Sequence, residues 1–225
     1  MLRSITLIAI LACFVALPAG AGVIIGNYSA GSTQVEGSGV FGLSSKAAGW
    51  TMPSGTNYSL DSVTLDLEYN YWYTGLLAPT VTAAIYGGSG SGPTGSALVT
   101  LVDPSFVNAG DPSSHAHANY VFTPPSAFTL TAGTTYWLVL SASQPSGQMD
   151  IDWMKSDPLI TPSGIATLAG YRFDSSGGVP PLGSSSTYNT FEVDGTRLAS
   201  PTPEPATMLL AAAGLSVVLL RRRWR

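Results

Sequence analysis

The aromatic run "EYNYWYTG" at residues 68–75 has the residue types of a carbohydrate-binding surface. If the strand-like alternation that precedes it continues, Trp72 lies on the outer face of a strand together with Asp66 and Glu68. An exposed indole ring stacks on the C–H face of a sugar, and neighbouring carboxylates accept hydrogen bonds from its hydroxyls. The alternative is that the strand bends after Glu68 and Trp72 packs at the rim of the core.

A second candidate site is the acidic segment "MDIDWMKSD" at residues 149–157. Asp150 and Asp152 alternate with apolar residues and therefore share one strand face, and Asp157 follows in the next turn. Carboxylates this close repel one another, so the cluster is solvated, paired with Lys155 or bridged by a cation. Calcium prefers such oxygen ligands, although the spacing matches no EF-hand loop. Calcium is the one cofactor that the sequence proposes, with a solvated acidic edge as the alternative.

Residues that could carry out catalysis form no organised motif. The nucleophile-elbow pattern G-x-S-x-G does not occur in the sequence. "GSGPTG" at residues 90–95 matches G-x-G-x-x-G, but Pro93 and the strand-like run after it predict a turn, not a helix that opens on a dinucleotide. His115 and His117 lie in a loop that runs into a strand and are expected to be solvated, with a metal site as the alternative. We therefore expect a protein that is not an enzyme.

The elements that position these residues are predicted to be short strands. "YSLDSVTLDLEY" alternates apolar and polar residues, and "TTYWLVLSA" at residues 134–142 is apolar on both faces, as in a strand that is covered on both sides. Similar runs recur between turns rich in Gly, Pro, Asn and Asp, without helical periodicity in the body of the chain. The pattern predicts an all-β, jelly-roll-like β-sandwich. Trp50, Trp137 and Trp153 are expected in its core.

The N-terminal segment has the features of a secretory signal peptide. Arg3 precedes an apolar run, Pro18 ends that run, and the small residues that follow predict cleavage after Ala21. The one cysteine of the chain, Cys13, lies in this segment. The exported domain is thus expected to have neither disulfides nor a cysteine-ligated metal.

The C-terminus combines three features of a membrane address. Pro203-Glu204-Pro205 is followed by fifteen uncharged residues (206–220), and then by the stop-transfer cluster Arg221, Arg222, Arg223 and Arg225. A helix of fifteen residues rises roughly 22 Å, which is less than the ~30 Å hydrocarbon core, so this segment is predicted to hold the protein only temporarily. The prolines keep the motif extended and accessible to a protease.

These residues resemble the PEP-CTERM sorting signal of Gram-negative bacteria. The resemblance implies processing near the motif by exosortase, a membrane enzyme of bacteria that make exopolysaccharide and biofilm. "YSLDSVTLDLEY", "TVTAAIY" followed by "GPTG", and "FTLTAGTTYWLVLSAS" are similar to the choice-of-anchor β-sandwich domains, notably type R, which implies a fold but no reaction. The expected organisation is a signal peptide (1–21), a β-sandwich domain (22–198), a Pro-rich linker (199–205) and a sorting tail with an apolar helix (206–225).

Charge narrows the choice of partners. Nine basic residues include Arg3 and the four C-terminal arginines, which leaves four against twelve acids in residues 22–200, a net charge near −8. Nucleic acid is therefore not an expected partner. The sequence predicts an exported structural or adhesive protein that contacts the inner membrane transiently and then joins the envelope or the exopolysaccharide matrix. The alternative is a carbohydrate-binding module that calcium assists. The N-glycosylation patterns at Asn27 and Asn57 are expected to be unused.

Overall fold

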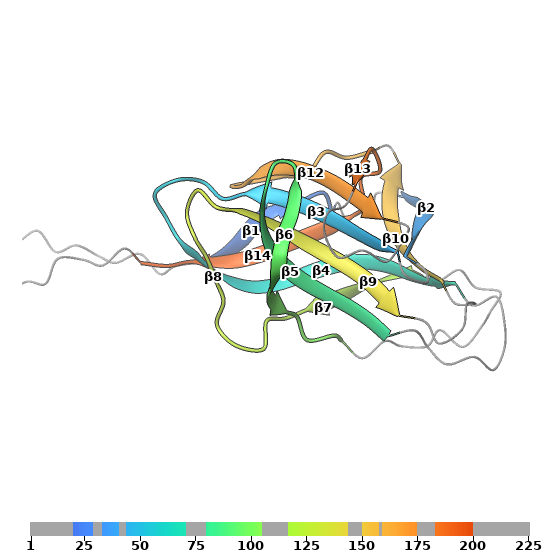
Figure 1. The fold of residues 1–225 in the computed structure, drawn as a ribbon, viewed down its shortest axis with the longest axis horizontal. Coiled ribbons are helices and arrows are strands. Elements are labelled where there is room, and N and C mark those ends of the chain that lie inside the picture. Colours follow the sequence, from blue (N-terminus) through green and yellow to red (C-terminus); the bar gives the residue numbers. More distant parts are fainter. Residues whose placement is uncertain are drawn as a thin grey trace, which may run out of the picture.

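The computed structural model describes residues 20–28, 33–40, 44–70, 80–104, 117–143, 150–157, 159–174 and 183–199. These ranges form fourteen strands in two antiparallel sheets and contain no helix (Figure 1). The predicted all-β sandwich is thus confirmed, whereas the sorting tail and residues 1–19 of the predicted signal peptide lie outside the described residues; Ala21, the last residue of that segment, stands at the start of β1. Within those ranges no helix is long and apolar enough to cross a membrane.

The first sheet is organised around its longest strand. Its eight strands are β1 (Ala21–Gly26), β2 (Thr33–Val40), β4 (Tyr58–Asn70), β7 (His117–Phe122), β8 (Thr129–Leu130), β10 (Asp150–Asp157), β11 (Ser163–Gly164) and β14 (Phe191–Arg197). One edge of β4 pairs first with β14 and then with β10, and its other edge pairs with β8 and β7. β1 pairs with β14 and β2 pairs with β10. Strand β4 therefore connects all the parts of this sheet.

The second sheet is covered on both faces. Its order is β13 (Gly183–Ser185), β12 (Thr167–Asp174), β3 (Ser45–Thr51), β9 (Thr135–Ser143), β5 (Thr80–Ser89) and β6 (Gly92–Thr100). Leu138 and Leu140 of β9 face the main core, whereas Trp137 and Val139 belong to a smaller apolar cluster on the opposite face. The prediction that residues 134–142 form a strand covered on both sides is confirmed.

The hairpin of β5 and β6 is fastened to the sheet beside this smaller cluster. The Arg172 side chain donates hydrogen bonds to the carbonyls of Gly90 and Ser91, and its guanidinium lies 5.2 Å from the centre of the Trp137 ring. Trp137 donates its indole N–H to the carbonyl of Ser89. The G-x-G-x-x-G match thus lies in a hairpin turn, as predicted, because the chain continues into a strand at its glycines.

The three tryptophans assigned to the core from the sequence are all buried. Trp50 and Trp153 lie between the two sheets, and Trp137 lies on the outer side of the second sheet, each with 0% of its surface exposed. The Trp153 indole donates to the carbonyl of Thr190 at 2.8 Å. These contacts confirm the predicted positions, although Trp137 serves the smaller cluster and not the main core.

Both ends of the described sandwich meet in neighbouring strands. β14 lies between β1 and β4, and Ala21 pairs with Thr196 (Figure 1). Asn27 fixes the far end of β1: its side-chain amide donates to the carbonyls of Ile160 and Asn189 and accepts from the N–H of Phe191. Asn27 is only 3% exposed, so its glycosylation pattern is not accessible in the folded domain.

We predict that Asn27→Ala lowers the free energy of unfolding by about 1–3 kcal/mol, because the buried N–H of Phe191 loses its side-chain acceptor and the carbonyls of Ile160 and Asn189 each lose one donor. Asn57→Ala is the matched control. Asn57 is exposed, and its side chain accepts one hydrogen bond, from the N–H of Ala132. Its replacement should cost less than about 1 kcal/mol. Chemical denaturation of both variants measures the difference, and equal losses would show that Asn27 does not fasten the strands.

Candidate functional site

Three adjacent strands bring separately predicted residues into one row. In β7, β4 and β10, His117 pairs with Glu68, and Glu68 pairs with Asp152. Asp66 stands two positions along β4, opposite Asn119. Paired residues in a sheet share a face, so these side chains lie on the same outer side of the first sheet. We call Asp66, Glu68, His117 and Asp152 the acidic patch.

The acidic patch combines two sites that the sequence kept apart. Asp66 and Glu68 came from the carbohydrate hypothesis, and Asp152 came from the calcium hypothesis. Strand β10 lies beside the end of β4, which places Asp152 opposite Glu68 although 84 positions separate them in the sequence. The two hypotheses therefore concern one surface.

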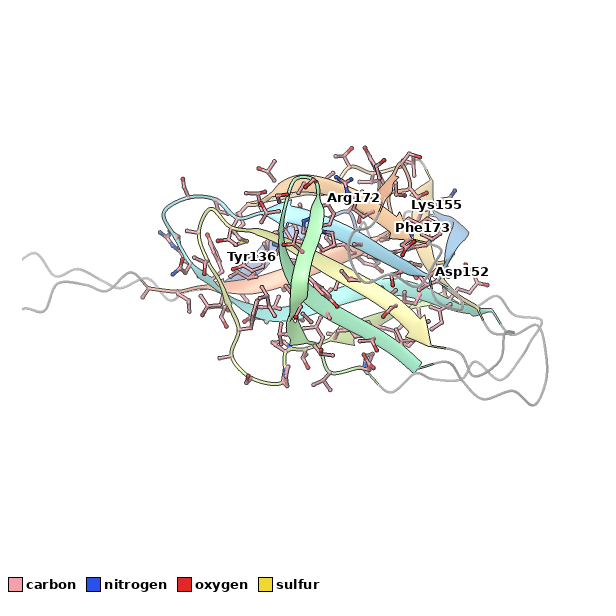
Figure 2. All side chains as sticks on the ribbon, in the orientation of Figure 1. Tyr136, Asp152, Lys155, Arg172 and Phe173 are labelled. Carbon is pink, nitrogen blue, oxygen red and sulfur yellow. The ribbon has the colours of Figure 1, made fainter. Side chains whose placement is uncertain are left out.

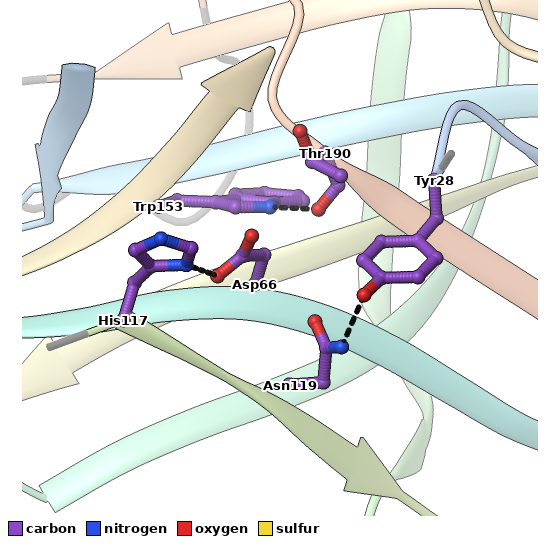
Figure 3. A network of polar contacts seen from close by, with 6 residues as sticks. All are labelled: Tyr28, Asp66, His117, Asn119, Trp153 and Thr190. Carbon is purple, nitrogen blue, oxygen red and sulfur yellow. Dashed lines mark hydrogen bonds and ion pairs between the residues drawn. The ribbon is translucent and has the colours of Figure 1, made fainter. Parts of the chain in front are cut away.

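Two carboxylates of the patch are buried, contrary to the sequence prediction of an exposed row. Asp66 is 2% exposed and Glu68 is 7% exposed, although both point away from the main core as expected. β7 and β10 flank β4 on its two edges, and the chain after β1 also reaches this face, where the hydroxyl of Tyr28 accepts a hydrogen bond of 2.6 Å from Asn119 (Figure 3). The alternation gave the right face of β4, but it did not reveal what covers that face.

Asp66 and His117 form a close polar contact within the acidic patch. The Nδ1 atom of His117 lies 2.9 Å from the Asp66 carboxylate, and the His117 side chain is 39% exposed (Figure 3). Burial raises the pKa of Asp66 above its ordinary value, the hydrogen bond and charge of His117 oppose this, and the charge of Glu68 adds to it. The predicted solvated histidine is thus a half-exposed residue with a buried partner.

The acidic patch has both buried and solvent-exposed hydrogen-bonding groups. The imidazole of His117 is held by a buried carboxylate, a contact that fixes the orientation of the ring. Asp152 is partly exposed, and Gly37 of β2 lies so close that a Cβ atom there would collide with the Asp152 side chain. The absence of a side chain at Gly37 therefore leaves room for the Asp152 side chain. Such a surface can donate to and accept from the hydroxyls of a ligand.

Several predicted site residues lie outside what the structure describes. These are Trp72, His115, the side chains of Asp150 and Asp157, the sorting motif Pro203-Glu204-Pro205, and the arginine cluster. The backbone of Asp150 pairs with Asn70, two residues before Trp72. Among the described side chains, no three His, Asp or Glu residues are close enough together to hold a metal ion. Calcium binding at Asp150, Asp152 and Asp157 stays a prediction.

Comparison with known families identifies the tail. The model of the PEP-CTERM protein-sorting motif matches residues 201–223, which include the Pro-Glu-Pro sequence and three of the four arginines. No curated protein matches the chain. The recognition of a PEP-CTERM signal is confirmed, and it supports an exported protein that is processed by exosortase. The resemblance to the choice-of-anchor domains stays a prediction.

We predict that His117→Ala lowers the free energy of unfolding at pH 7 by about 1–3 kcal/mol, because the Asp66 carboxylate stays buried without the imidazole. Asp66 already has a raised pKa in the folded state, so its ionised form opposes folding, and the loss of His117 raises that pKa further. The extra cost therefore grows as pH rises above the raised folded-state pKa of Asp66, where its carboxylate ionises, and disappears at lower pH.

Denaturant titrations of this variant between pH 3 and pH 8 measure the effect, and Asn119→Ala on the same strand is the matched control. Asn119 bonds to the exposed Tyr28, so its removal should cost less and should not depend on pH. Adding Asp66→Asn to His117→Ala should recover most of the lost stability. A loss of the same size at pH 3 and pH 7 would contradict the assigned electrostatic role.

Proposed function

We propose that this chain is an exported, non-enzymatic β-sandwich protein with a structural or adhesive role in the exopolysaccharide matrix. The spacing between the domain and its address carries the proposal. The matched sorting motif begins at residue 201, four positions after β14 ends at Arg197. Cleavage in the motif would therefore remove no strand and would release the complete sandwich as cargo.

The topology supports a temporary tether. β1 and β14 are antiparallel neighbours, so the signal peptide and the sorting tail are both attached at the same end of the sandwich. The domain can therefore fold outside the membrane while either segment is still inserted. The apolar run of the tail is short for a permanent span, which favours retention followed by cleavage.

The net charge and the polar contacts favour a passive role for the domain. The exported body carries twelve acids against four basic residues, so it stays soluble and is repelled by anionic lipid after release. In the acidic patch, His117 is hydrogen-bonded to Asp66. A structural or adhesive protein needs such a stable, charged surface and no reacting group.

We predict that Glu204→Ala combined with Pro203→Ala keeps the protein in the membrane fraction of its natural producer, because exosortase no longer recognises the tail. The unchanged chain should be found in the released or matrix fraction with a lower mass. Pro201→Ala, outside the Pro-Glu-Pro triplet, is the control and should behave like the unchanged chain. Immunoblots of the fractions measure this. Release of the double variant at the normal rate would contradict the proposal that exosortase cleaves the tail at this motif.

Carbohydrate binding is the second candidate function, because the sheet register places the partly exposed Asp152 and the 39% exposed His117 on either side of the buried Glu68, near the end of β4. Trp72 follows that end by two residues. If the protein binds polysaccharide there, Trp72→Ala should reduce retention on polysaccharide beads at least tenfold, and Trp72→Phe should reduce it less because a ring remains to stack.

The same beads test the calcium hypothesis. Retention that falls when calcium is chelated would support a cation at the acidic residues, and unchanged retention would count against it. Binding that is insensitive to Trp72 would leave the matrix role without this sugar site.

A further inference from the structure

The end of the sandwich from which the tail leaves is a single hydrogen-bonded surface. Gly133 donates its N–H to the carbonyl of Pro53, Ala132 donates to the side chain of Asn57, and Leu198 donates to the carbonyl of Asn57 at 2.9 Å. These bonds join the turn between β3 and β4, the turn between β8 and β9, and the last described residues. We call residues 52–57, 131–134 and 197–199 the tether face.

The tether face is almost free of charge. Its single charged residue is Arg197, which is exposed and lies 3.5 Å from the hydroxyl of Thr56. The nearest carboxylates along β4 and β14 are already hydrogen-bonded, since Asp61 accepts from Thr196 and Asp194 accepts from Ser62. The remaining surface consists of small and uncharged residues, with Leu198 36% exposed.

Several acidic residues lie toward the opposite end. β4 begins at the tether face with Tyr58 and ends at Asn70, which pairs with Asp150. Asp174 pairs with Ser45, at the end of β3 that is remote from the tether face. Figure 2 shows Asp152 and Lys155 on the side away from the end of β14. Charge is therefore distributed unevenly along the long axis of the domain.

We propose that the tether face rests on the lipid headgroups of the membrane that holds the sorting tail until the tail is cleaved. Seven residues (199–205) separate Leu198 from the apolar run. At ~3.1 Å per residue in an extended proline-rich chain, they span about 22 Å, so the face cannot move far from the bilayer. Such a linker gives an effective concentration of millimolar order, at which a weak contact is populated.

The distribution of charged residues favours the tether face as the surface that turns toward the lipid. An anionic membrane attracts Arg197 and repels carboxylates within about one Debye length, ~8 Å at physiological salt. The tether face itself carries no carboxylate, so it meets less of that repulsion than the acidic patch does, although Asp61 and Asp194 lie behind it. Its hydroxyls and amides can bond to the headgroups. The acidic patch then points outward. The proposal depends on the proposed function only for retention of the tail in the bilayer.

The test uses the full chain in nanodiscs that contain anionic lipid. A fluorophore is attached to Ser184→Cys, an exposed position on β13, in a Cys13→Ser background that leaves no other thiol. Time-resolved anisotropy then reports whether the domain tumbles with the disc or independently of it. We expect a docked domain to show the slow correlation time of the whole disc.

Three substitutions on the tether face separate docking from simple attachment. Ser54→Glu, Thr131→Glu and Leu198→Glu together place carboxylates on exposed positions, and the chain with this triple change should tumble freely. The matched chain with Gln at the same three positions has similar size without charge and should stay mostly docked. Melting curves check that all the chains are folded.

Two results would overturn the proposal. One is fast tumbling of the unchanged chain while it still co-purifies with the discs. The other is slow tumbling of the Glu chain to the same extent as the unchanged chain. Because the discs contain no exosortase, neither result bears on cleavage, and a failure of cleavage in cells would leave the anisotropy result standing.

Discussion

The insertion of β14 between β1 and β4 is the constraint on which the rest of the structure depends. The last strand of the domain is a central strand, so the first sheet cannot close until the chain has been exported through Arg197. The same pairing sets Ala21 beside Thr196 and brings the two ends of the described domain together at one end of the sandwich. The segments before β1 and after β14 therefore both leave from this end.

Burial without thiols explains the architecture of the second sheet. The described residues contain no cysteine, so the sandwich relies on packing, and β9 contributes side chains to two apolar clusters instead of one. The β5–β6 hairpin, fastened through Arg172, is attached beside the outer cluster. The outer face of the first sheet differs, because there the carboxylates of Asp66 and Glu68 are buried and the more exposed His117 bonds to Asp66. The two outer faces therefore differ in chemistry: one is a second hydrophobic contact, and the other is a polar surface with hydrogen-bonding potential.

The local pattern of apolar and polar residues predicted the strands, but the pairing of strands distant in the sequence determines which residues form the candidate site. The alternation around Val63 and Leu65, the doubly apolar run at residues 134–142 and the buried tryptophans followed from side-chain type and period. The contact of His117 with Asp66 bridges 51 positions and exists only because β7 pairs with β4 in one register. Burial of Asp66 and Glu68 was likewise not predictable, since it depends on which strands and loops lie beside β4. Periodicity assigns a residue to a face, but only the assembled sheet determines whether that face is open.

We propose that the sorting tail holds the protein temporarily and is removed after the sandwich has been exported. The intact mass of the protein purified from its natural producer is the decisive measurement, because one value reports both ends of the chain. We expect a mass that corresponds to a start near Gly22 and an end beside Glu204, apart from any group added at the new terminus. A mass that still includes the arginine cluster and Trp224 would contradict it and would make the protein a permanent membrane resident.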